Sequence, residues 1–165
     1  MNVIPRLLFV LALVLVPVVV WTTSADLPAR VASHFGNGGL ANGWMPRDGY
    51  LALMLGLTTL LPLLVVAMTG FIPRIAVSQI KLPDRGHWLS PARRGETLAW
   101  LASHACWLGL VLMLFLGGIH VLTVQANLRV PPRLSEPHFF TLLGAFVVLL
   151  VLWIVALGLR FRRAL

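Results

Sequence analysis

Residues 27–50, LPARVASHFGNGGLANGWMPRDGY, form a polar segment between two strongly apolar runs of the chain. The segment contains one histidine, five glycines, two asparagines and one tryptophan. The apolar run on each side approaches or exceeds the ~20 residues that an α-helix needs to cross a bilayer. The polar segment is therefore expected to connect two membrane-spanning helices at one face of a membrane.

The composition of the whole chain indicates the same class of protein. Of 165 residues, 59% are hydrophobic and 11% are charged, whereas ordinary soluble domains have about 25% charged residues. The net charge of +8 does not predict nucleic-acid binding, because no basic run is longer than the pairs Arg93-Arg94 and Arg162-Arg163. Basic residues that flank membrane helices explain the charge better. We expect most of the protein surface to contact the lipid bilayer, and we expect no nucleic-acid partner.

Four apolar segments predict the fold. They cover residues 4–21, 50–72, 98–124 and 139–159, and each is close to or longer than the length needed to span the hydrocarbon core. The sequence therefore predicts an all-α integral membrane protein with four transmembrane helices, forming a single membrane domain over residues 1–165. The connections are residues 22–49, 73–97 and 125–138.

The distribution of basic residues predicts the orientation. Nine of them lie in the two termini and the 73–97 connection, and four lie in the other two connections. Cytoplasmic loops carry an excess of lysine and arginine, so we expect both termini and the 73–97 loop in the cytoplasm. The segments 22–49 and 125–138 are then extracytoplasmic. An alternative stays open for the first span, because Arg6, the apolar stretch 7–21 and the small residues 23–25 are also typical of a cleaved signal peptide.

The 73–97 loop contains a predicted helix start. Ser90 is suited to cap the third helix, with Pro91 at its first position. Arg93 and Arg94 would then lie in the first turn, where they oppose the helix dipole. We expect these two arginines to face anionic lipid headgroups.

Candidate chemistry is sparse. None of the five carboxylates falls inside a span, and no nucleophile, nucleotide or metalloprotease motif is present. We therefore expect a protein that is not an enzyme and has no cofactor. One alternative is a metal site formed by His34, His120 and His138 at the outer face. His104, inside the third span, is expected to form a hydrogen bond to a neighbouring helix.

The polar segment 27–50 has the chemistry of an ordered cap. Gly36, Gly38 and Gly39, with Asn37 between them, permit positive φ and tight reversals. Asn42-Gly43 is a strong turn dipeptide, and Trp44 is suited to the membrane interface. Backbone donors in such turns could bind a peptide. We expect the segment to be ordered over the helix ends, with His34 and Phe35 near its centre.

Two stretches resemble a known family. They are similar to segments of the small bacterial membrane family called domain of unknown function 1648. The two stretches are LPARVASHFGNGGLANGW and IKLPDRGHWLSPARRGETL. In the first stretch the matching positions are Leu27, Pro28, Val31, His34, Phe35, Gly39, Asn42, Gly43 and Trp44. In the second they are Leu82, Pro83, Trp88, Leu89, Pro91, Arg93, Arg94 and Glu96.

The resemblance implies a location and a kind of function. The best-known relatives in that family are immunity proteins of the SdpI type, which protect a cell from a secreted peptide toxin and take part in membrane signalling. It implies a multi-pass protein of the bacterial cytoplasmic membrane that binds a peptide or partner protein through its extracytoplasmic loop. The partner-binding residues would be His34, Phe35, Gly39, Asn42, Gly43 and Trp44. An accessory subunit of a larger membrane complex, a small transporter, and a membrane enzyme or metal protein are the alternatives.

Overall fold

Four long helices make up most of the computed structural model, which describes residues 3–162. They are α1 (Ile4–Ser24), α2 (Arg47–Thr69), α4 (Arg94–Asn127) and α5 (Glu136–Arg160). Each is long and apolar enough to cross a membrane. The four spans expected from the sequence are confirmed, although α4 has 34 residues and extends beyond the expected span at both ends. The chain is a mostly helical, multi-pass membrane protein.

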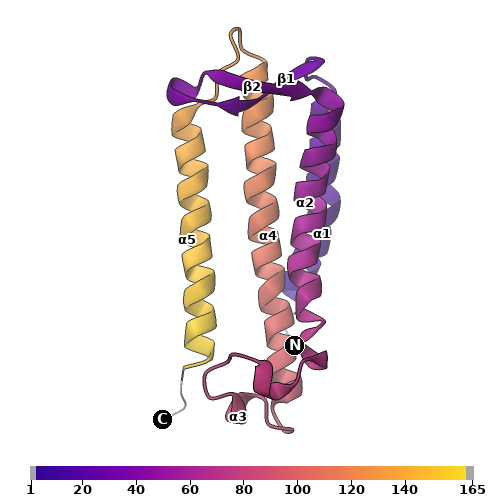
Figure 1. Cartoon of the computed structure of the whole chain (residues 1–165), viewed down its shortest axis with the longest axis vertical. Coiled ribbons are helices and arrows are strands. Elements are labelled where there is room, and N and C mark those ends of the chain that lie inside the picture. The colour runs from indigo at the N-terminus through magenta and orange to yellow at the C-terminus, as the bar shows by residue number, and fades with distance from the viewer. Residues whose placement is uncertain (1–2, 163–165) are drawn as a thin grey trace.

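Helix α4 occupies the centre of the bundle. Figure 1 shows α1 and α2 on one side of it and α5 on the other. Gly109 of α4 permits close packing, because a Cβ atom there would lie 2.5 Å from Cε2 of Phe9 in α1. No residue of α5 is buried, so α5 is attached to the bundle mainly along one face of α4.

A β-hairpin lies across one end of the bundle (Figure 1). Strands β1 (Arg30–Phe35) and β2 (Ala41–Pro46) pair antiparallel, and the register shifts on both sides of His34. A short 3-10 turn, η1 (Asn37–Gly39), joins them. These two strands are not predicted from the sequence, since glycine and asparagine are uncommon in strands.

The expected turn at Asn42-Gly43 is wrong, because both residues lie in β2. The reversal occurs instead at residues 36–40, where Gly36 N–H donates to the Leu40 carbonyl at 2.8 Å. Gly43 has a different role. It faces His34 across the ladder, and a Cβ atom at position 43 would lie 3.0 Å from the Cβ of His34.

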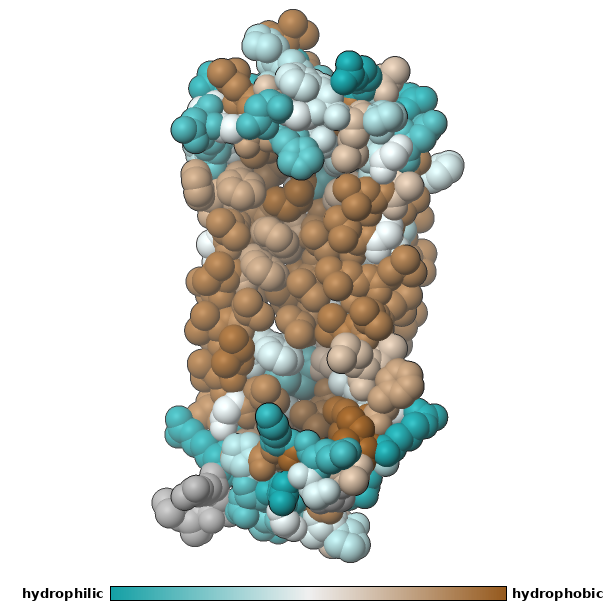
Figure 2. Space-filling view, in the orientation of Figure 1, coloured by the Kyte–Doolittle hydropathy of each residue, from teal (hydrophilic) through white to brown (hydrophobic). Residues whose placement is uncertain are grey.

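The opposite end of the bundle carries the connection between α2 and α4. This connection contains the 3-10 turns η2 (Ile72–Arg74) and η3 (Val77–Gln79) and the short helix α3 (Arg85–Trp88). We call it the α3 end; the start of α1 and the end of α5 lie there as well (Figure 1). The two groups of basic residues thus lie at opposite ends, and Figure 2 shows a mostly apolar band between them.

The expected start of the third helix at Ser90 and Pro91 is wrong. Helix α4 begins at Arg94, with Arg93 at the N-cap position. The Ser90 hydroxyl donates to the His87 carbonyl at 3.0 Å, and the Ser90 carbonyl accepts from Arg94 N–H at 2.9 Å. Because its side chain is engaged with α3, Ser90 closes a turn between the two helices and does not cap α4.

Candidate functional site

One side chain at the end of α4 forms hydrogen bonds to the first strand of the hairpin. The Asn127 amide oxygen accepts from Ala32 N–H at 2.8 Å, and its amide nitrogen donates to the Ala32 carbonyl at 3.0 Å. The same nitrogen lies 2.9 Å from the Thr123 carbonyl. The carboxamide thus forms hydrogen bonds to both backbone polar groups of Ala32, which is fully buried. Without these bonds, the two groups would be buried unpaired, which costs free energy.

The turn of the hairpin is fixed by the connection between α4 and α5. Gly38 and Gly39 both have φ of 72°, a region that favours glycine. Leu134 N–H donates to the Gly39 carbonyl at 2.8 Å, and Arg133 Nε donates to the Gly38 carbonyl at 2.7 Å. A Cβ atom on Gly39 would collide with the Leu134 carbonyl oxygen. Only glycine therefore allows the turn to lie this close to the connection.

A buried polar network lies beneath the hairpin. His120 of α4 is completely buried, with Nε2 2.7 Å from the Thr23 hydroxyl of α1 and Nδ1 3.0 Å from the Tyr50 hydroxyl of α2. The Thr23 hydroxyl lies 2.6 Å from the Val19 carbonyl, to which it donates. Since a hydroxyl has one proton, Thr23 accepts from His120 Nε2–H, and Nδ1 accepts from Tyr50. The imidazole is therefore neutral, both of its nitrogens have a hydrogen-bond partner, and it joins α1, α2 and α4.

A cleft opens between the hairpin, α4 and α5. Its volume is about 450 Å³, and Figure 2 shows the surface hollowed below the polar cap. The hairpin and its turn supply one wall, and α4 and α5 with the preceding connection supply the rest. The lining residues are Ser33, His34, Phe35, Gly36, Asn37, Gly39, Ile119, Thr123, Leu134, Glu136, Phe139 and Phe140.

The structure brings together half of the expected partner-binding residues. His34, Phe35 and Gly39 line the cleft, whereas Asn42, Gly43 and Trp44 of β2 do not. The His34 ring is exposed, and its Nδ1 lies 3.1 Å from the Ser33 hydroxyl. Trp44 is 48% exposed, as an interfacial anchor would be.

Nine of the twelve lining residues were not expected to bind a partner, and among these nine Glu136, Phe139 and Phe140 supply the charge and the aromatic surface on α5. All three lie in the first two turns of α5, where they were assigned to the ordinary flank and start of a span. Glu136 is exposed and forms no ion pair with any residue in the range 3–162. An acidic residue beside paired phenylalanines at a helix start was the available signal.

The structure does not support the alternative metal site. Within residues 3–162, no group of three histidine, cysteine, aspartate or glutamate side chains is placed to hold a metal ion. Both nitrogens of His120 are engaged by hydroxyls. His138 is exposed and lies 2.6 Å from the Ser135 hydroxyl. His34, His120 and His138 are thus separate features of the hairpin end.

The expected interhelical hydrogen bond of His104 is confirmed. Nε2 of His104 donates to the Trp153 carbonyl of α5 at 3.1 Å, and Trp153 Nε1 donates to the His104 carbonyl at 2.9 Å. The imidazole is stacked between Trp100 and Trp153, with ring centroids at 4.4 and 4.6 Å. This reciprocal pair holds α5 against α4.

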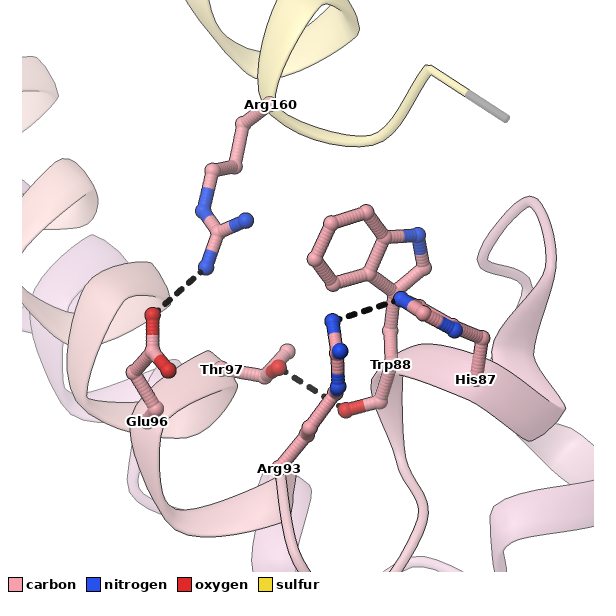
Figure 3. Close-up of polar contacts among 6 residues, drawn as sticks. All are labelled: His87, Trp88, Arg93, Glu96, Thr97 and Arg160. Atoms are coloured by element: carbon pink, nitrogen blue, oxygen red, sulfur yellow. Dashed lines mark hydrogen bonds and ion pairs between the residues drawn. The ribbon is translucent and has the colours of Figure 1, made fainter. Parts of the chain in front are cut away.

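The residues singled out in the 73–97 loop form a second cluster, at the α3 end (Figure 3). The buried Trp88 lies under the Arg160 guanidinium, whose carbon is 4.7 Å from its ring. Thr97 donates from its hydroxyl to the Trp88 carbonyl at 2.8 Å, and Arg160 forms an ion pair of 3.0 Å with Glu96. These contacts join the loop, α4 and the end of α5.

Two other residues of the 73–97 loop region, Arg93 and Arg94, also form hydrogen bonds within the α3 end. Arg93 donates to His87 Nε2 at 2.7 Å, and Arg94 donates to the Pro73 carbonyl at 2.9 Å. Pro83 and Pro91 are exposed in the turns that precede α3 and α4. Both arginines therefore have partners within the chain in addition to any contact with lipid headgroups.

Comparison with protein-family models, curated proteins and solved structures finds no match. The fold and the contacts described above therefore define the class, a four-span helical membrane protein capped by a β-hairpin. The resemblance to the domain of unknown function 1648 stays a prediction carried by the two stretches of sequence.

Proposed function

We propose that this protein is a non-enzymatic membrane protein that binds a peptide, or a peptide-like segment of a partner protein, at its hairpin end. The observation that carries the proposal is the cleft of about 450 Å³. A cleft of this size, with mostly apolar walls and a few polar groups, is typical of ligand sites. It also contains three of the residues singled out by the sequence.

The lining favours a particular kind of occupant. Phe35, Phe139 and Phe140 offer aromatic surface, the residue type that contributes most to anchoring a partner. Glu136 supplies a negative charge with no partner within residues 3–162. The expected occupant is therefore an apolar or aromatic peptide segment with an amine or guanidinium group close to its anchor.

The orientation is part of the proposal. The excess of basic residues at the α3 end favours a cytoplasmic location for that end, which would place the hairpin and its cleft outside. An exposed cleft on that face would meet secreted peptides. Together with the family resemblance, this supports peptide-toxin immunity or envelope signalling in the bacterial cytoplasmic membrane.

A displayed peptide library provides the test. Purified protein in lipid nanodiscs is used to select peptides, which we expect to be enriched in an aromatic residue near a lysine, an arginine or a free N-terminus. Phe35→Ala and Glu136→Gln should each lower the affinity of the selected peptides at least tenfold. Trp44→Ala, on β2 outside the cleft, is the matched control and should retain the wild-type affinity.

Two results would overturn the proposal. One is that no peptide is enriched over empty nanodiscs. The other is that Trp44→Ala abolishes binding while the two cleft variants bind as the wild type does. In cells, His34→Ala should abolish protection or signalling at an unchanged level of protein in the membrane. The His34 side chain is exposed, and within residues 3–162 its one side-chain hydrogen bond is to Ser33.

One structural feature favours the alternative of an accessory subunit. Helix α5 has no buried residue, so most of its surface is available to lipid or to another chain. This alternative predicts stoichiometric co-purification with other membrane proteins in mild detergent. A solitary monomer under those conditions would contradict it.

A further inference from the structure

A groove runs along α4 and α5 within the apolar band, at the end away from the hairpin. Its volume is about 420 Å³, and its walls include Trp100, Trp107, Trp153, Leu149 and Ala156, with Pro5 at the start of α1. We call it the tryptophan groove. In Figure 2 a recess interrupts the apolar band just above the α3 end.

The groove has the length of one leaflet. On α4 it extends from Trp100 to Val111, which is about 16 Å at 1.5 Å per residue. Half of a hydrocarbon core of ~30 Å is ~15 Å. Because Trp100 is near the start of α4 and Leu149 is near the middle of α5, the groove runs from the interface to the bilayer centre.

The mouth of the groove is positively charged. The Arg160 guanidinium carbon lies 5.9 Å from the Trp100 ring, and Arg160 follows Ala156 by one helical turn. Its acidic partner is Glu96, which accepts from one terminal nitrogen of Arg160 at 3.0 Å. Within residues 3–162 the guanidinium forms no other hydrogen bond, so its other donors can bind a phosphate.

We propose that the tryptophan groove binds one acyl chain of an anionic phospholipid, with the headgroup phosphate held at Arg160. The groove supplies an apolar trough of the right depth, and its mouth supplies the complementary charge. A bound chain would fill the groove between α4 and α5, beside the stacked pair His104 and Trp153 that forms part of its lining. This lipid would be a structural part of the α4–α5 contact.

Brominated lipids test the proposal, because bromine on an acyl chain quenches tryptophan fluorescence at contact. A background with Trp21→Phe and Trp44→Phe leaves four tryptophans, three of which line the groove. Brominated phosphatidylglycerol is titrated into phosphatidylcholine nanodiscs that contain this protein. We expect a saturable component of quenching at low mole fraction, which brominated phosphatidylcholine does not produce. Quenching that rises only in proportion to the mole fraction of either lipid would overturn the proposal.

Variants then locate the site. Ala156→Leu fills the groove and should remove the saturable component. Gly158→Leu is the matched control, because nothing lies within 4 Å of its Cβ position and it does not line the groove. Arg160→Gln should remove the preference for phosphatidylglycerol. The proposal is wrong if Ala156→Leu keeps the saturable component, and its headgroup assignment is wrong if Arg160→Gln keeps the preference.

Discussion

Nε2 of His120 lies 2.7 Å from the hydroxyl oxygen of Thr23, 97 positions away in the chain. This contact and the one from Tyr50 to Nδ1 join α1, α2 and α4 directly below the hairpin. Hydrogen bonds between buried side chains matter here, because removing one partner leaves the others without water to replace it. The hairpin therefore lies over the ends of α1, α2 and α4, and these contacts fix the spacing between those three helix ends.

Removal of His120 should weaken the bundle measurably. We expect His120→Ala to lower the free energy of unfolding by about 1–3 kcal/mol, since it removes the acceptor of the buried Tyr50 hydroxyl and the donor to the Thr23 hydroxyl. Unfolding in mixed micelles by titration with a denaturing detergent measures this change. His138→Ala, an exposed histidine at the same end, is the control and should leave the midpoint unchanged. Equal midpoints for wild type and His120→Ala would show that the network contributes nothing.

The turn of the hairpin should not tolerate a side chain at Gly39. Gly39→Ala places a methyl group against the Leu134 carbonyl at a φ of 72°, and such strained positions cost about 1–3 kcal/mol. We expect faster hydrogen exchange of residues 30–46 while the four helices keep their protection. Gly49→Ala is the matched control, because its Cβ would meet nothing within 4 Å. Unchanged exchange in Gly39→Ala would contradict the observed contact.

Asn127 should control how firmly strand β1 is attached. Asn127→Leu removes both hydrogen bonds to Ala32 and leaves two buried backbone groups unpaired. We expect a loss of hydrogen-exchange protection in β1. Asn127→Asp keeps an acceptor for Ala32 N–H but loses the donor to its carbonyl, so its effect should be intermediate. If Asn127→Leu protects β1 as well as the wild type does, the attachment lies elsewhere.

At the α3 end, the buried aromatic residue should matter more than the ion pair. Trp88→Ala removes a buried indole that contacts Arg160 and Phe161, and substitutions of this kind cost about 3–5 kcal/mol. Glu96→Gln breaks an ion pair whose carboxylate is 77% exposed, and such pairs contribute about 0–1 kcal/mol. Detergent-induced unfolding compares the two variants. A larger loss for Glu96→Gln than for Trp88→Ala would reverse this ranking.

Cysteine labelling checks the proposed orientation. Asn37→Cys is at an exposed position in the turn of the hairpin, and Gly86→Cys is at an exposed position of helix α3. In intact cells a membrane-impermeant maleimide should label the first variant, and it should label the second only after permeabilisation. The natural Cys106 is 5% exposed and should give little background. The opposite pattern would place the hairpin in the cytoplasm.

The four spans could be predicted from the sequence because they depend on local properties. A run of about 20 apolar residues is sufficient to identify a membrane helix, whatever it packs against. The hydrogen bond of His104 to another helix was predictable for a similar reason, since an isolated polar side chain within a span needs a partner. The identity of that partner, Trp153, was not.

The hairpin and the cleft could not be predicted, because their contacts are distant in the chain. Asn127 bonds to Ala32 and Arg133 to Gly38, each across 95 positions. Local turn chemistry predicted reversals both at residues 36–39 and at Asn42-Gly43, and the fit of Gly39 against Leu134 selects residues 36–40. Glu136, Phe139 and Phe140 became cleft residues only because the α4–α5 connection places them beside the hairpin.

The sequence by itself determined that this is a four-span membrane protein with basic residues concentrated at one end. Both properties follow from composition along the chain, which hydrocarbon and headgroups select without reference to packing. The tertiary structure alone decided that the polar segment 27–50 forms a β-hairpin and that His34 and Phe35 share a cleft with Glu136. Those features depend on backbone and side-chain hydrogen bonds between distant segments, which exist only after the helices have assembled.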